Sequence, residues 1–132
     1  MFIIVDGQPV AKGRPKVSFK AKRVYTPPKT VEHEKHIRNC FYRSGPHEPI
    51  EGPIRLTITF SMQIPKSWSM GKKHSAEIGM TRPIGTPDLD NLIKMIDALN
   101  GLAFKDDSQI VELFAVKKYG TPQTSILLEG IE

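Results

Sequence analysis

Five of the six aspartates in the 132-residue chain lie between Asp88 and Asp107, and their spacing suits metal-dependent chemistry. If the start of this segment is helical, Asp90, Lys94 and Asp97 fall on one face, because they lie at positions i, i+4 and i+7. The opposite face is then apolar and carries Leu89, Leu92, Ile96 and Leu99. One face of the predicted helix therefore belongs to the core, and the other presents two carboxylates flanking an ammonium group.

A return of the chain would add carboxylates to that polar face. Gly101 permits a sharp reversal after the helix, which predicts that Asp106 and Asp107 come back toward the helix start. Converging carboxylates repel one another unless a cation neutralises them, and Mg²⁺ prefers carboxylate and water oxygens. Such a site can activate water against a phosphodiester, while Lys94 stabilises the developing charge. The alternative is a surface ion pair between Asp90 and Lys94 beside an acidic turn without chemistry.

The basic residues indicate a phosphate-rich partner. The net charge is +5, and up to Arg43 the chain holds ten Lys and Arg against Asp6, Glu32 and Glu34. A basic segment of this kind can hold a nucleic-acid backbone, although such runs are also often only solvated. The candidate DNA-binding residues are Lys12, Arg14, Lys16, Lys66, Lys72 and Lys73. No glycine-rich phosphate loop is found, so no nucleotide cofactor is expected.

The elements that must position these residues follow from hydrophobic periodicity. Strands are predicted at 2–5, 54–64, 110–119 and 125–131, with a further short one at 23–25. Helices are predicted at 29–42 and 88–99, with a short one at 69–78 inside the long polar connection 65–87. Residues 8–22 are expected to form an exposed loop or a loose hairpin. The order of elements predicts one α+β domain over 1–132, a two-layer structure with two main helices on a mixed or largely antiparallel sheet.

The single cysteine, Cys40, excludes an internal disulfide and suits a reducing compartment. It is predicted to lie on the apolar face of a helix, and so in the core, together with Val31, either His36 or Ile37, and Phe41. The four histidines are expected to be surface or helix residues, because one cysteine leaves any zinc–thiolate site incomplete. Neither a secretory signal nor a membrane-spanning apolar run is found, so the protein is expected to be soluble and cytoplasmic.

The acidic segment resembles the signature of the RusA family of Holliday junction resolvases, which are found in bacteria and often in prophages. The matching blocks are Asp88-Leu89-Asp90-Asn91-Leu92-Ile93-Lys94, Asp97-Ala98-Leu99 and Asp106-Asp107-Ser108-Gln109-Ile110. Residues 7–16, 25–34 and 64–69 resemble further blocks of the family, in the same order along the chain. The spacing from Lys94 to Asp97 is one residue shorter than in the commonest form of the signature.

The resemblance implies a homodimeric endonuclease that binds a four-way DNA junction and nicks two strands symmetrically, in recombination and repair. It implies that Asp88, Asp90 and Asp107 are catalytic and bind Mg²⁺, for which Mn²⁺ would substitute. It also implies that Lys94 is catalytic, and it ranks Asp106 below these four. The enzyme would associate with the nucleoid when it acts, and it would have no membrane partner.

Two other functions stay open at this point. A non-catalytic module for branched nucleic acid would bind without cutting in Mg²⁺, and a metal-dependent nuclease for forks or flaps would share the acidic site. The roles of Tyr25 and Trp68 also stay open, because each aromatic ring can either stack on an unpaired base or pack within the protein.

Overall fold

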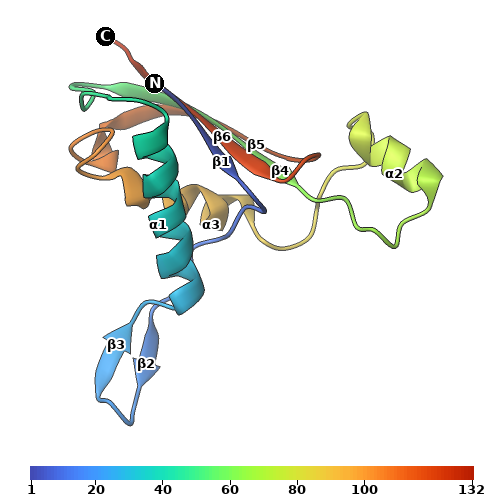
Figure 1. The fold of residues 1–132 in the computed structure, drawn as a ribbon, viewed down its shortest axis with the longest axis horizontal. Helices are drawn as coiled ribbons and strands as arrows, with labels where there is room; N and C mark the ends of the chain where they lie inside the picture. The colour runs from blue at the N-terminus through green and yellow to red at the C-terminus, as the bar shows by residue number, and fades with distance from the viewer.

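The computed structural model describes residues 1–132 as a four-stranded mixed sheet with helices covering one of its faces, together with a small two-stranded sheet (Figure 1). The sheet order is β1-β6-β4-β5, and its strands are β1 (Phe2–Asp6), β4 (Ile54–Met62), β5 (Ile110–Tyr119) and β6 (Gln123–Gly130). Strands β4 and β5 run parallel, whereas β6 is antiparallel to both β1 and β4. The predicted α+β architecture with a mixed sheet is confirmed.

Strand β4 lies at the centre of the core because its side chains alternate as the sequence predicts. Ile54, Leu56, Ile58 and Phe60 are all buried, while the intervening residues face the other side of the sheet. Helix α1 (Pro28–Arg43) covers the apolar side with Ile37, Cys40 and Phe41. Val31 does not join them, since it is 49% exposed, so its predicted place on the buried face is wrong.

Two parts project from this body (Figure 1). The first is a hairpin of β2 (Lys16–Ser18) and β3 (Arg23–Tyr25), called here the basic arm and comprising residues 14–25. The second is α2 (Met70–Glu77), whose start is capped by the Ser69 side chain accepting from the Lys72 amide. The expected loose hairpin and short helix are both confirmed. No helix combines the length and apolar character needed to cross a bilayer.

The segment predicted as one helix over 88–99 divides in two, which corrects that prediction. An α-helical turn, α3 (Leu89–Ile93), is followed by a 3₁₀-helix, η1 (Lys94–Leu99). A 3₁₀-helix repeats every three residues, so side chains at i and i+3 align. The rows Met95/Ala98 and Ile96/Leu99 are both buried, and the remaining row, Lys94 and Asp97, faces outward. The tighter helix therefore buries two rows of side chains and still presents the charged one.

Candidate active site

The first two predicted metal ligands lie at the start of α3. Asp88 is the N-cap residue, and Asp90 lies in the first turn, with both side chains exposed. The chain leading into them is held against the sheet by Lys117 of β5, whose Nζ donates to the carbonyls of Gly85 (2.7 Å) and Pro87 (2.9 Å). This lysine fixes the entry to α3 without using the carboxylates, which stay free for a ligand.

A second acidic group forms where η1 meets the loop before β5. The Asp97 and Asp107 side chains hydrogen-bond to each other. Lys12 Nζ donates to Asp97 Oδ2 at 2.8 Å, and the Lys12 amide donates to the Asn91 carbonyl at 3.0 Å. The N-terminal segment therefore brings a cation to two carboxylates that come from separate elements.

Gln109 holds the loop that carries Asp107. Its Oε1 accepts from the amides of Lys105 (2.9 Å) and Asp106 (3.1 Å). Its Nε2 donates to the carbonyls of Ile50 (2.9 Å) and Gly52 (3.0 Å). Asp106 accepts from the Ser108 amide at 3.2 Å and completes a capping box at η2 (Asp107–Gln109). Gln109 and Asp106 thus have structural roles that orient Asp107.

The shared hydrogen bond separates the pKa values of the two carboxyls. The bond to Asp97, aided by partial burial, raises the pKa of Asp107 to about 6. Burial acts to raise the pKa of Asp97, but hydrogen bonds from Asp107 and Lys12 outweigh it and lower that pKa. The Asp97 hydrogen bond in turn raises the pKa of Lys12. Without a metal ion, one proton and one ammonium therefore neutralise this pair at mildly acid pH.

The structure gathers only some of the predicted residues. Asp107 returns to the helical segment, but it meets Asp97 rather than the helix start, and Asp90 and Asp97 are separated by roughly 12 Å of helical rise. Lys94 Nζ donates to Asn91 Oδ1 at 3.2 Å, between these two acidic groups. Sequence reasoning placed Asp97 on the polar face but did not identify it as the partner of Asp107. The feature of the sequence that could have pointed to Asp97 is its position three residues after Lys94, which places it next to that lysine on a helix.

The donor set of these two groups fits a hard divalent cation. Carboxylate oxygens are the protein ligands that Mg²⁺ prefers, and Asp88, Asp90 and Asp107 offer no softer atom. In the Asp97–Asp107 contact a proton occupies a place that a cation would take, because both neutralise the repulsion between carboxylates. The exposure of Asp88 and Asp90 leaves room for water molecules in the coordination shell.

The basic arm is fixed to the acidic site at its root. The Gly13 amide donates to Oγ1 of the buried Thr30 at 2.9 Å, which joins the arm to α1. A Cβ atom at Gly13 would lie 2.9 Å from both Pro27 Cγ and Thr30 Oγ1, so only glycine allows this approach. The preceding residue, Lys12, contacts Asn91 and Asp97. The position of the arm is therefore tied directly to the position of the carboxylates.

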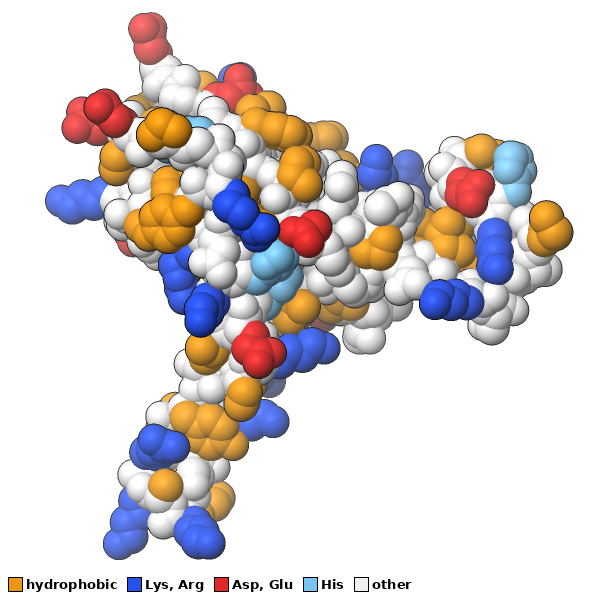
Figure 2. Space-filling model, viewed as in Figure 1, with side chains coloured by type: hydrophobic (Ala, Val, Ile, Leu, Met, Phe, Trp, Pro, Cys, Tyr) orange, Lys and Arg blue, Asp and Glu red, His pale blue; other side chains and the backbone are white.

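The remaining candidate DNA-binding residues lie on the two projections, where Figure 2 shows Lys and Arg side chains gathered. Arg14 and Lys16 on the arm are exposed, as are Lys66 and Lys72 near α2, while Lys73 is half-buried. Trp68 packs edge-on against Tyr119 with ring centroids 5.2 Å apart, and Lys72 Nζ lies 4.0 Å from the Trp68 ring centroid. Packing thus accounts for Trp68, whereas Tyr25 stays partly exposed on the arm.

Two comparisons with known proteins agree with this geometry. The sequence model of the family described as endodeoxyribonuclease RusA matches residues 6–129. An uncharacterized Bacillus subtilis protein, YqaN, is 35% identical over 133 aligned residues, which cover 96% of this chain and 94% of YqaN. The matched region includes both acidic groups, the basic arm and α2.

Replacing Gln109 by alanine should loosen the loop that carries Asp107. The substitution leaves two amides and two carbonyls without their partner, so we expect the free energy of unfolding to fall by about 1–3 kcal/mol. Urea denaturation measures this change, and Gln63→Ala provides the control, because Gln63 is exposed and makes no side-chain hydrogen bond. Equal stability of the two variants would show that the Gln109 hydrogen bonds do not fix this loop.

In the metal-free protein, Asp107 should titrate near pH 6, as followed by carboxyl NMR, and closer to its ordinary range in Asp97→Asn. Because the folded pKa lies above the unfolded one, protonated Asp107 stabilises the fold at low pH, and this contribution is lost as the pH rises through about 6. Asp107→Asn should therefore raise the melting temperature relative to wild type more above pH 6 than below the unfolded pKa. A difference independent of pH would contradict the shared hydrogen bond.

Proposed function

The chain belongs to the endodeoxyribonuclease RusA family, and from this premise we propose that it is a Mg²⁺-dependent nuclease that resolves Holliday junctions by paired, symmetric nicks. The family is one of endodeoxyribonucleases, which hydrolyse phosphodiester bonds in DNA. The observation that carries the proposal is that Lys12, at the root of the basic arm, contacts both Asn91 and Asp97 of the acidic site. We propose that the enzyme acts in DNA recombination and repair.

The proposed catalytic residues have different roles according to where they lie. Asp88, Asp90 and Asp107 would hold Mg²⁺ once the loop that carries Asp107 moves toward the start of α3, and Mn²⁺ with its similar ligand preference would substitute. When bound, the ion supplies an activated water and stabilises the leaving oxygen. Asp97 orients Asp107 through the shared hydrogen bond, and Lys12 compensates their charge. Lys94 is exposed beside Asn91, from which its ammonium can reach a phosphate oxygen as negative charge develops there.

The two projections suit a branched substrate better than a straight duplex. The arm leaves the body just after Lys12, and the connection that carries α2 ends at Pro87, next to Asp88. In Figure 1, α3 lies between these two projections. Both projections carry exposed lysine or arginine, so each can contact the backbone of a different duplex arm while a phosphodiester lies at the carboxylates. The exposed Val17, Phe19 and Val24 on the arm offer apolar contacts to unpaired bases.

Paired nicking requires two active sites, and we propose that a homodimer provides them. A two-fold junction is naturally bound by a two-fold protein. Strand β5 supports the proposal, because it is a ten-residue edge strand with Val111, Leu113 and Phe114 all more than half exposed. Exposed apolar side chains along a free edge suit contact with a second copy of the chain.

The proposed activity is tested with a labelled mobile four-way junction in Mg²⁺ or EDTA. We expect symmetric nicks in two strands that require Mg²⁺, and a loss of at least about 100-fold in rate for Asp90→Asn, since that residue is a proposed ligand of the catalytic ion. Glu129→Gln, which removes an exposed carboxylate on β6, is the matched control and should cut normally. Duplex and fork substrates run in parallel.

Each alternative gives a distinct result in that experiment. Tight binding without cutting in any divalent ion would favour a non-catalytic module. Equal cutting of forks and junctions would support metal-dependent cleavage but contradict the proposed specificity for four-way junctions. Full activity of Asp90→Asn would show that the Asp90 carboxylate is not needed for catalysis.

The arm should contribute phosphate contacts that depend on salt. For the Arg14→Ala/Lys16→Ala variant we expect the slope of log K against log salt concentration to fall by about 0.9 for each phosphate that the arm no longer neutralises. Fluorescence anisotropy with a labelled junction in Ca²⁺ or EDTA measures the slope without cleavage. Lys118→Ala, an exposed lysine on β5, is the control and should leave the slope unchanged. An unchanged slope in the arm variant would mean that its basic residues are only solvated.

A further inference from the structure

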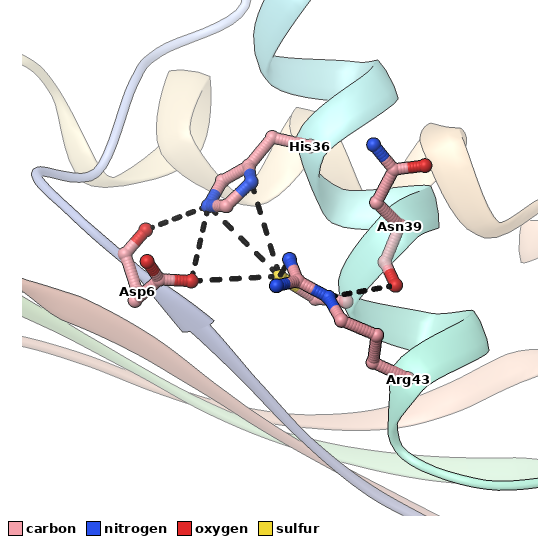
Figure 3. Close-up of polar contacts among 5 residues, drawn as sticks. Asp6, His36, Asn39 and Arg43 are labelled. Atoms are coloured by element: carbon pink, nitrogen blue, oxygen red, sulfur yellow. Dashed lines mark hydrogen bonds and ion pairs between the residues drawn. The ribbon is translucent and has the colours of Figure 1, made fainter.

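A second group of metal-ligating side chains lies at the edge of the sheet remote from the acidic site. Asp6 ends β1, and His36 and Cys40 lie one turn apart on α1. One donor atom from each lies within 4.8 Å of the other two, and no other three such residues meet this condition. Figure 3 shows Asp6, His36 and Arg43 converging on the sulfur atom. We propose that this triad is a binding site for Zn²⁺, separate from the proposed Mg²⁺ site.

The spacing of the three donor atoms fits tetrahedral zinc. His36 Nε2 lies 3.3 Å from Asp6 Oδ1, and Cys40 Sγ lies 3.7 Å from that oxygen and 3.9 Å from that nitrogen. Bond lengths of about 2.3 Å to sulfur and about 2.0 Å to nitrogen and oxygen give tetrahedral edges of roughly 3.3 Å between N and O and roughly 3.5 Å to S. Each observed distance lies within about 0.4 Å of its ideal. Cys40 Sγ is also 4.0 Å from His36 Nδ1, so the imidazole ring must rotate to point Nε2 at an ion held by all three side chains.

The chemistry of the donors selects a different ion from the acidic site. A thiolate, an imidazole and one carboxylate form a borderline-soft set that favours Zn²⁺ over Mg²⁺. The triad comes from β1 and α1, whereas the carboxylates of the acidic site come from α3, η1 and η2, so the two sites share no ligand. The sequence suggested that the lone cysteine left no zinc site, because it gave no sign that Asp6 would approach α1.

The surroundings allow an ion to enter, and Arg43 offsets part of the cost of forming the buried thiolate. A hollow open to solvent reaches the sulfur between β1 and the end of α1, lined by Phe2, Ile4, Asp6, Cys40, Arg43 and Ser44. Arg43 Nη2 donates to Cys40 Sγ at 3.5 Å, and Arg43 Nε donates to the Asn39 carbonyl at 3.4 Å. A guanidinium in this place favours the negatively charged sulfur that binds metal.

Proton transfers accompany binding. In the metal-free chain the Cys40 thiol donates to Asp6 Oδ1, and His36 Nε2 contacts the Asp6 carbonyl at 2.8 Å. On binding, the thiol loses its proton to solvent as the S–Zn bond forms. His36 Nε2 gives up its hydrogen bond to the Asp6 carbonyl and loses its proton to solvent while Nδ1 takes one up, so that the Nε2 lone pair faces the ion. Burial raises the pKa of the Cys40 thiol, so zinc affinity should increase with pH. Water fills the fourth coordination position.

The test is a Co²⁺ titration of the full-length, EDTA-treated protein in excess Mg²⁺, which keeps oxygen-ligand sites occupied. We expect about one equivalent of Co²⁺ to give a thiolate charge-transfer band and intense visible bands of tetrahedral geometry, both displaced by Zn²⁺. Zn²⁺ should also raise the melting temperature in proportion to log concentration. His74→Gln, an exposed histidine on α2, is the control and should behave as wild type.

Three variants remove one ligand each: Asp6→Asn, His36→Gln and Cys40→Ser. All should lose the tetrahedral spectrum and the thermal shift by Zn²⁺. Asp6 is exposed, so Asp6→Asn keeps the test decisive if Cys40→Ser, at a site only 6% exposed, fails to fold. Absence of the charge-transfer band in wild type, or its retention in Asp6→Asn and His36→Gln, would overturn the proposal. Neither outcome bears on junction cleavage, because the acidic site shares none of these residues.

Discussion

The contact of Lys12 with Asp97, and through it with Asp107, is the constraint that orders the functional half of the molecule. Three segments meet there: the irregular segment 7–13 that leads to the basic arm, the 3₁₀-helix and the loop before β5. Each carboxylate would repel the other if both were ionised, so the contact persists only while a proton or a cation occupies the site. A divalent ion bound to Asp107 would therefore take the place of the proton that Asp97 and Asp107 share.

Periodicity predicted the strands and α1 closely because one buried face dominates each of them. Burial alternates along β4 from Ile54 to Phe60, and the core residues of α1 recur at helical spacing. Residues 94–99 behaved differently, since burial on two sides favours a three-residue repeat over the 3.6-residue one. The sequence showed how many apolar residues this segment holds, but it did not show on which sides of the segment the rest of the protein would pack. Tertiary packing alone decided the type of helix.

In the candidate site, too, the sequence predicted some features, whereas others depend on tertiary packing. The motif identified Asp88, Asp90, Lys94 and Asp107 by their chemistry and order, and it remains the basis for their proposed roles. Pairing between distant residues could not be inferred, because charge has no periodicity along the chain. Lys12 was predicted to bind DNA with the rest of the basic segment, yet its ammonium lies against Asp97. Gln109 was identified only as one residue of the motif. Its side-chain amide hydrogen-bonds to four backbone groups and so orients Asp107.

Helix α1 links the two proposed metal sites mechanically without sharing ligands between them. Its first turn supplies Thr30 to the root of the arm, and its third and fourth turns supply His36 and Cys40 to the triad. The segment 7–12 runs between these anchors, from Asp6 at one end to Lys12 at the other. An ion bound to the triad would fix Asp6 to α1 and so restrain both ends of that segment. Because a folded helix is rigid over this length, the restraint would reduce the motion of the arm relative to the carboxylates while leaving their coordination chemistry unchanged.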